Sequence, residues 1–402
     1  MEIALEIFNY ALVAILIGIS GTWIILIRSM IISFRKSPHL DRFNPIQHNN
    51  PKVSVILPAR NEENFIKQCL NSLLDQDYEN YEIVAIDDSS EDNTGKIINE
   101  YAKKNSRIIF VNAKPKPDDW MGKNWACMEG YRKATGELLL FTDSDTRHSR
   151  NAISLAVSHL FSQNLDALTV SPKMVCLDIW TKITLPMLST FLHTRFSALN
   201  VNNPNKKTAY FFGSFYIIRR DVYESIGRHD GVKHEIVEDG ALGKKVKERG
   251  YKLRMVRGDH LIDAVWARDF SSLWQGLKRL MVPMYLQNNR IAVGIFFAVL
   301  FLLFMPFPIM LYSIFFFQMT NSFLLLLIGA LSASILIYLA AIVEVRILHL
   351  NFSNALLCPA GGFIVAFGFL NGILSAKSDN AITWKGRNYS MKEYIQNSIQ
   401  VS

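Results

Sequence analysis

Cysteine is scarce in this sequence, and its scarcity narrows the chemistry that the chain can support. The 402 residues include four cysteines, at positions 69, 127, 176 and 358, and no two of them have a paired spacing. Neither a disulfide framework nor a zinc site is therefore indicated. The sequence also lacks a glycine-rich phosphate-binding loop with its lysine, which disfavours a nucleotidyltransferase.

Charge is missing from three long runs, at residues 7–27, 291–343 and 347–376. A bilayer core needs roughly 20 apolar residues per helical span. The first run supplies one span, and the second is long enough for two, divided at the polar residues 318–322. The stretch of about 260 residues between the first two runs has a mixed composition, enough for one large domain.

The first hydrophobic run could be a membrane anchor or a secretory signal. Glu2 and Glu6 precede it in place of basic residues, and no small-residue cleavage pattern precedes Arg28, so we favour a retained anchor. Basic residues follow the run directly and predict a cytoplasmic central domain. The formal net charge of +8 is concentrated in such flanks and suits an anionic leaflet better than nucleic acid.

These patterns divide the chain into five parts. We expect a transmembrane anchor over residues 1–33, a linker over 34–50 and a globular domain over 51–290. A membrane region should follow over 291–376 and a cytoplasmic tail over 377–402. The membrane region should hold two spans and a glycine-rich third segment that is either a span or a re-entrant helix. Four full spans would place Lys385 and Arg387 outside, against the charge rule, so we expect the tail to return and cover the domain's cleft.

The globular domain alternates short β-branched runs with helical patterns. Strands are predicted at 53–57, 81–86, 108–111 and 137–142, and helices at 64–76, 94–103 and 125–134. This alternation predicts an α/β fold with a mainly parallel, doubly wound sheet. In such sheets a ligand binds outside the carboxyl ends of the strands.

Polar clusters follow three of the predicted strands. The second cluster holds Asp87 and Asp88, and the third holds Asp143 and Asp145. The first cluster consists of Pro58, Ala59, Arg60, Asn61 and Glu62. A single such cluster is most simply a turn. Three clusters at one sheet edge favour a ligand site, because neighbouring carboxylates repel unless a cation lies among them. A divalent cation that bridges a diphosphate would be such a partner.

Two further segments carry candidate groups. Lys123 offers a cation and Asn124 a hydrogen-bond donor close to the third strand end, where phosphates could lie, although a solvated surface lysine fits equally well. Glu238 and Asp239 open a predicted helix at 241–249, where they could be simple capping residues. A hydroxyl that attacks a sugar carbon needs a carboxylate base, and Asp239 is the better candidate for that base.

Residues 51–279 resemble the family 2 glycosyltransferases, which have the GT-A fold. The resemblance rests on the three clusters taken in order, on the segment from Phe212 to Ser214, and on Glu238 with Asp239. It implies that residues 58–62 and 87–88 line a nucleotide pocket, that Asp143 and Asp145 flank the diphosphate and a Mg²⁺ or Mn²⁺ ion, and that Asp239 is the general base, supported by Glu238. Gly213 would lie on the acceptor and phosphate side, and the reaction would be inverting.

Two shorter segments, 120–126 and 384–389, are similar to the hopanoid- and carotenoid-pathway glycosyltransferases, which also carry one amino-terminal and several carboxy-terminal spans. The chain departs from the processive members, whose Gln-x-x-Arg-Trp motif grips the acceptor. Residues 274–280 hold the same residue types in another order, which argues against a cellulose- or hyaluronan-type polymerase. Trp274 and Arg279 could still serve the acceptor or a phosphate, or they could belong to a plain interfacial helix.

The sequence therefore predicts a multi-pass cell-membrane enzyme with a cytoplasmic catalytic domain. It should move one sugar from a nucleotide-diphosphate sugar to a lipid acceptor with the help of a divalent cation. A processive polysaccharide synthase would share every donor motif and stays open as an alternative. A non-catalytic lipid-binding or translocating membrane protein is also compatible with the hydrophobic runs, but it leaves the aspartate clusters unexplained.

Overall fold

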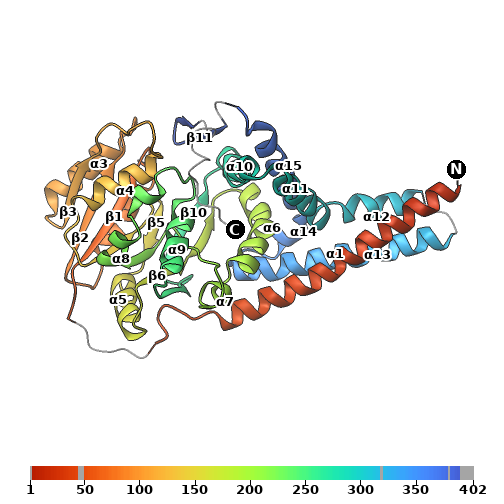
Figure 1. Ribbon diagram of the computed structural model, residues 1–402, viewed down its shortest axis with the longest axis horizontal. Helices are drawn as coiled ribbons and strands as arrows, with labels where there is room; N and C mark the ends of the chain where they lie inside the picture. The colour runs from red at the N-terminus through yellow and green to blue at the C-terminus, as the bar shows by residue number, and fades with distance from the viewer. Residues whose placement is uncertain (1, 44–48, 317–319, 379–380, 390–402) are drawn as a thin grey trace.

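A computed structural model describes residues 2–43, 49–316, 320–378 and 381–389 (Figure 1). Its centre is a seven-stranded sheet with the order β3-β2-β1-β4-β8-β6-β9. The strands are β1 (Val53–Ala59), β2 (Tyr81–Asp87), β3 (Ile108–Asn112), β4 (Leu138–Phe141), β6 (Ala167–Ser171), β8 (Tyr216–Arg219) and β9 (Leu253–Arg257). Only β8 runs antiparallel to its neighbours, so the predicted mainly parallel sheet is confirmed.

Both faces of the sheet are covered, because successive side chains of a strand point to opposite faces. Val55 and Leu57 of β1 pack into one core, and Ile56 packs into the other. The first core is closed by α2 (Ile66–Leu74), α3 (Thr94–Lys104) and α5 (Ala152–Ser162). The second core is closed by α4 (Gly122–Tyr131), α8 (Arg220–Ser225) and α9 (Glu238–Glu248).

A small three-stranded sheet with the order β5-β10-β7 connects this domain to the rest of the chain. Its strands are β5 (Thr146–His148), β7 (Lys173–Cys176) and β10 (Ile262–Ala267). β7 leads into α6 (Ile179–Arg195), and β10 leads into α10 (Phe270–Gln287). Two short helices, α7 (Ala198–Val201) and the 3₁₀ helix η1 (His229–Val232), complete the globular domain.

Within the described residues, three helices are long and apolar enough to cross a membrane: α1 (Glu2–Lys36), α13 (Asn321–Ile347) and α15 (Cys358–Ser375). A fourth candidate is the pair α11 (Asn289–Leu303) and α12 (Pro306–Phe315), which is bent by 52°. α1 and α13 lie side by side and extend away from the sheets (Figure 1). These helices coincide with the uncharged runs of the sequence, although part of the predicted polar break, at 317–319, lies outside the described residues.

The glycines of the last hydrophobic run lie at close helix contacts. α15 is continuous from Cys358 to Ser375 and follows the short α14 (Ser353–Leu356). A Cβ atom on Gly361 would lie 2.0 Å from the carbonyl oxygen of Ile183, and one on Gly368 would lie 2.5 Å from Leu277 Cδ1. The glycines therefore allow α15 to pack closely against α6 and α10.

The described part of the tail folds back over the catalytic domain. β11 (Ile382–Trp384) and β12 (Arg387–Tyr389) form an antiparallel hairpin next to α10 (Figure 1). Gly386 makes the turn with a φ of 78°, a conformation that glycine adopts without steric cost. Residues of this hairpin contact Arg60, Glu62 and Asp88, and residues 379–380 and 390–402 lie outside the described part.

Candidate functional site

The three polar clusters meet at the carboxyl ends of β1, β2 and β4. After β1 the chain turns at Asn61, whose φ of 54° lies in the left-handed region that asparagine tolerates. This turn lets Arg60 donate a hydrogen bond to the carbonyl oxygen of Asp88 at 2.8 Å. The neighbouring Pro58 and Ala59 are the last residues of β1 itself. The clusters are therefore brought together as the sequence predicted.

The Asp88 carboxylate is buried and is held by the tail hairpin. Nη2 of Arg387 lies 3.0 Å from Asp88 Oδ1, and the guanidinium also contacts Oδ2. Burial raises the pKa of Asp88, although Arg387 and Arg60 oppose the shift. Asp87, the other member of the pair, accepts a hydrogen bond from the Ser90 backbone N–H at 3.2 Å. One of the two predicted nucleotide-side carboxylates is thus already paired with a cation.

Glu62 is also buried, and two cations bind it. Arg268 and Lys385 each donate to one of its carboxylate oxygens. Arg268 was not singled out from the sequence, although it follows β10 directly and so occupies another strand end. Its guanidinium stacks over Phe65 at 4.7 Å from the ring centroid, which fixes its position beside the cluster. Lys385 and Arg387 were noted only as part of the tail.

Lys123, at the start of α4, bridges two carboxylates of the site. Its Nζ lies 2.7 Å from Asp143 Oδ1 and 2.7 Å from Glu238 Oε1. Burial alone would lower the pKa of Lys123, but Asp143, Glu238 and the nearby Asp239 hold it well above the usual range. A permanent cation therefore lies between the end of β4 and the start of α9.

Asn124 is turned away from this cluster. Its side-chain nitrogen donates to the carbonyl oxygens of Val232 at 2.7 Å and Glu235 at 2.9 Å. Both amide hydrogens are thus used, and neither is left for a phosphate. The geometry supports a role for Asn124 in holding the segment that precedes α9, rather than the predicted donor role.

Asp239 is fixed by backbone groups at the start of α9. Its Oδ2 accepts a hydrogen bond from the Gly213 N–H at 3.0 Å, and its Oδ1 accepts one from its neighbour Gly240 at 2.7 Å. A Cβ atom on Gly213 would lie 2.9 Å from Asp239 Oδ2 and 3.0 Å from Lys123 Nζ. Only glycine at this position allows the carboxylates and the lysine to come so close.

Two carboxyl groups of the site have strongly raised pKa values. Burial and the neighbouring Glu238 raise the pKa of Asp239 to about 7. Burial and the charges of Glu62 and Asp143 raise the pKa of Asp145 to about 7. A carboxyl group with a pKa near neutrality can accept a proton efficiently at physiological pH. Such shifts are typical of functional sites, although structural clusters also produce them.

The surroundings of Asp145 fit a divalent cation. The nearest cationic group is the Arg268 guanidinium, 3.8 Å away, and it does not offset the repulsion from Glu62 and Asp143. Carboxylate oxygens are the ligands that Mg²⁺ and Mn²⁺ prefer, and phosphate oxygens complete their coordination in many enzymes. Asp145 and Asp143 would supply protein ligands, and the cation would neutralise charge that develops on a leaving phosphate.

Residues 54–227 match the model of the family described as glycosyl transferase family 2. The chain contains a family 2 glycosyltransferase domain. It is similar to a probable glycosyltransferase, YdaM, of Bacillus subtilis (29% identity over 247 residues, 59% of this chain and 58% of the relative). It is also similar to the 4,4'-diaponeurosporenoate glycosyltransferase of Staphylococcus haemolyticus (28% over 196 residues, 48% of this chain and 50% of the relative). The matches thus span little more than half of these relatives.

The fold of the glycosyltransferase domain and its helices also has a counterpart among solved structures. A mannosyltransferase from Pyrobaculum calidifontis, solved in complex with GDP-Man and Mn²⁺, superposes with a TM-score of 0.53 at 18% identity. The superposition covers 92% of this chain and 99% of the other. The predicted GT-A fold, a mainly parallel α/β sheet with apolar helices at both ends of the chain, is therefore confirmed.

α10 connects the glycosyltransferase domain to the membrane helices, and it brings only one of its two predicted residues to the site. Burial lowers the pKa of Arg279, an effect that Glu238, Asp143 and Asp239 oppose, so Arg279 lies within the field of these carboxylates. Its guanidinium lies 5.9 Å from the centroid of the Trp384 ring in the hairpin. Trp274 instead stacks on Phe270 and packs among the residues of the helical bundle.

A largely apolar cavity of about 80 Å³ lies where α1 and α6 meet the glycosyltransferase domain. Met30 and Phe34 of α1 and Leu192 of α6 line one side, and Tyr210 and Phe212 line another. Phe212 directly precedes Gly213, whose N–H binds Asp239. The lining of the cavity therefore includes the residue that precedes Gly213, but neither Gly213 nor Asp239 itself.

Proposed function

We propose that this protein transfers a single sugar from a nucleotide-diphosphate sugar to a membrane lipid, with inversion at the anomeric carbon. The observation that carries the proposal is the position of Asp239. This carboxyl group has a pKa of about 7 and is fixed by the Gly213 N–H, and Phe212, the residue before Gly213, lines an apolar cavity that borders α1. A base at that point would serve an apolar acceptor on one side and a phosphorylated donor on the other.

The proposed reaction is a displacement at the anomeric carbon of the donor. The acceptor hydroxyl oxygen forms a bond to that carbon while its proton passes to Asp239. The bond between the anomeric carbon and the diphosphate oxygen breaks, and the electron pair leaves with the nucleoside diphosphate. A divalent cation at Asp145 and Asp143, Mg²⁺ or Mn²⁺, would offset the charge on that leaving group. Glu238 holds Lys123, whose ammonium group lies beside Asp143 on the phosphate side.

The nucleotide is expected on the other side of the cluster, over β1 and β2. Arg60, Glu62, Asp87 and Asp88 lie there, and the hairpin that carries Lys385 and Arg387 covers them. The relatives support this donor class, because the Pyrobaculum enzyme was solved with GDP-Man and Mn²⁺. We propose that the hairpin closes over the bound donor and that its cations contact the donor's phosphates or base.

The acceptor is expected to be a lipid that reaches the site from the membrane. The cavity lined by Phe212 is largely apolar and is bounded by α1, which is one of the candidate spans. At about 80 Å³ the cavity is too small for a whole lipid, so the acceptor must widen it or place only its head group there. We propose a multi-pass cell-membrane protein whose catalytic domain faces the cytoplasm, where nucleotide sugars are made and where the basic flanks of α1 are favoured.

The test is to incubate membranes that contain the full chain with a panel of labelled nucleotide sugars and Mn²⁺ or Mg²⁺, and then to extract the lipids. One donor should label a lipid-soluble product that carries one sugar, and an Asp239→Asn variant expressed at the same level should give none. Label in a long, water-soluble polymer would favour a processive synthase instead. The absence of label with every donor, together with no nucleotide binding, would refute a catalytic role.

A further inference from the structure

A second cluster of ionisable side chains lies away from the transfer site, where the chain leaves α1 and enters the catalytic domain. The backbone there is attached to β9: the Leu40 N–H donates to the Arg257 carbonyl at 2.8 Å, and the Arg257 N–H donates to the Pro38 carbonyl at 2.8 Å. These bonds hold His39 beside Arg257. The side chain of His39 is thus positioned next to the turn between β9 and β10.

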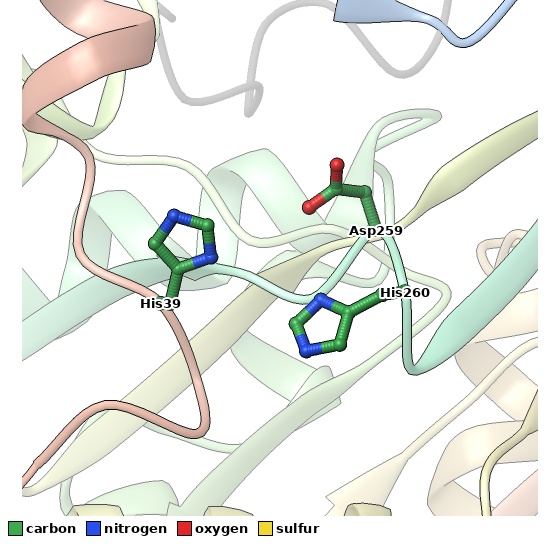
Figure 2. A group of neighbouring side chains, drawn as sticks. All are labelled: His39, Asp259 and His260. Atoms are coloured by element: carbon green, nitrogen blue, oxygen red, sulfur yellow. The ribbon is translucent and has the colours of Figure 1, made fainter.

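That turn presents two further side chains with ligand atoms. Leu261 and Ile262 both donate backbone hydrogen bonds to the Gly258 carbonyl, at 2.9 Å each, so Asp259 and His260 are held in a tight turn. Figure 2 shows the side chains of His39, Asp259 and His260 gathered around a common space. Each offers one nitrogen or oxygen atom, and these three atoms lie within 4.8 Å of one another.

The remaining atoms of these side chains already have partners that orient them. Asp41 Oδ2 lies 3.1 Å from His260 Nε2, which leaves Nδ1 of that ring for another ligand. Asp259 Oδ2 accepts from His349 Nε2 at 2.7 Å and from Arg257 at 2.8 Å. Asp259 Oδ1 is buried and has no hydrogen-bond partner among the described residues. A carboxylate that binds the far nitrogen of a ligand histidine is a common feature of metal sites.

The charges around the cluster permit a cation. Asp41 and Asp259 contribute two negative charges, and Arg257 and Arg42 oppose them with two positive charges. The arginines weaken the attraction for a cation, and Arg257 binds Asp259 through Oδ2, not through Oδ1.

We propose that His39, Asp259 Oδ1 and His260 Nδ1 form a binding site for a divalent transition metal of the Zn²⁺ class, with water as a fourth ligand. Imidazole and carboxylate together suit Zn²⁺, whereas Mg²⁺ and Mn²⁺ favour the oxygen-rich transfer site. Bonds of about 2.0–2.2 Å in a tetrahedron would bring the ligand atoms to roughly 3.5 Å from one another, so the rings must move inward slightly. The cysteine spacing gave no sign of this site, because its ligands are histidines far apart in the sequence.

A metal here would join three parts of the chain. His39 belongs to the segment after α1, and Asp259 and His260 belong to the catalytic domain. His349, which binds Asp259, lies just after the end of α13, so the helical bundle is tied to the same group. The ion would therefore fix the catalytic domain relative to the membrane helices, independently of donor binding.

The test uses the full chain in detergent, purified without a histidine tag, dialysed against a chelator and titrated with Zn²⁺ by calorimetry in the absence of nucleotide. We expect one Zn²⁺ per chain with a micromolar or tighter dissociation constant. His39→Gln and His260→Gln should each weaken binding by at least about tenfold, since each removes a ligand of similar size and polarity. Asp41→Asn should weaken binding less, because it removes only the group that orients His260.

Two controls identify the ion's position. His349→Gln retains an N–H donor toward Asp259 and removes no proposed ligand, so its affinity should stay within about twofold. Asp145→Asn should leave the Zn²⁺ stoichiometry unchanged, which separates this site from the transfer site. Zn²⁺ should also raise the melting temperature of the parent chain but not that of the His39→Gln/His260→Gln double variant. The absence of stoichiometric binding in the parent chain, or equal binding in the double variant, would overturn the proposal.

Discussion

The two halves of the transfer site differ in how their acidic groups are balanced. On the nucleotide side, Glu62 is held by Arg268 and Lys385, and Asp88 is held by Arg387. On the transfer side, Asp145 has only a long ion pair to Arg268, at 3.8 Å, and the pKa values of Asp145 and Asp239 are each raised to about 7. Cations of the protein balance the Glu62 and Asp88 carboxylates of the first half, whereas the carboxylates of the second half need a proton or a further cation.

This difference follows from where each cation comes from. The cations of the nucleotide side are contributed by β10 and by the tail hairpin, which close over the carboxyl ends of β1 and β2. The single lysine of the transfer side, Lys123, is shared between Asp143 and Glu238, and its charge does not balance Asp239. Under the proposed function this difference separates binding from chemistry: variants of one half should change donor affinity, and variants of the other should change turnover.

The largest effect is expected for Asp239→Asn. An amide cannot accept the hydroxyl proton, so kcat should fall by roughly 10³-fold, within the range of a general base. The Michaelis constant for the donor should change little, because Asp239 lies outside the nucleotide half. The measurement is the initial rate of sugar transfer, with thermal unfolding as the check on folding. A variant that keeps more than a tenth of the parent rate would remove Asp239 from the role of base.

Asp145→Asn should come next, with a loss of about 10²-fold in turnover at a fixed Mn²⁺ concentration. Higher Mn²⁺ should restore part of the rate, because the cation loses one ligand but keeps the diphosphate. The substitution should not destabilise the metal-free protein. Because the pKa of Asp145 is raised in the folded state, ionisation of this group lowers the free energy of unfolding as pH rises from about 4 to 7, and the amide avoids that loss. A metal dependence identical to that of the parent chain would contradict a ligand role for Asp145.

Arg387→Ala tests the nucleotide half. If the hairpin closes over the donor, loss of this guanidinium should raise the donor's Michaelis constant by about tenfold and leave kcat within a factor of three. Arg279→Ala is a matched comparison, because it removes a guanidinium on α10 that faces Trp384 of the hairpin and leaves the guanidinium bound to Asp88 in place. A lower Michaelis constant for Arg387→Ala would show instead that the hairpin blocks the pocket.

The pH dependence should give the smallest effect. Because the pKa of Asp239 is about 7, the base is active above that value and is lost as pH falls through it. The kcat/KM should drop by roughly fivefold from pH 7 to pH 6 and level off above pH 8. Saturating Mn²⁺ should remove any contribution of Asp145 to this pH dependence, since the metal competes with the proton for the Asp145 carboxylate. A profile that is flat between pH 6 and pH 8 at saturating Mn²⁺ would contradict the raised pKa of the base.

Much of the site could be predicted from the sequence because its residues follow strand ends. Periodicity located β1, β2, β3 and β4, and a parallel sheet brings their carboxyl ends together. The same reasoning could not place Arg268, since β10 belongs to a separate small sheet and pairs with β5 and β7. Its position depends on how the two sheets face each other, which no local pattern records.

The errors of the sequence reasoning have a common physical cause. Asn124 was expected to face phosphates because it neighbours Lys123, but adjacent residues on a helix do not share a face. The glycines of α15 left a span and a re-entrant helix both open, and their close packing against α6 and α10 could not be foreseen. In both cases the partner is distant in sequence, so the residue type alone could not tell which contact it makes.

The most direct measurement is the stoichiometry of the reaction in purified protein with its donor, Mn²⁺ and extracted membrane lipid. The account predicts that one nucleoside diphosphate is released for each lipid product, that the product carries one added sugar by mass, and that Asp239→Asn forms neither. Release of nucleoside diphosphate without a glycosylated lipid, or a lipid product in the Asp239→Asn variant, would contradict it.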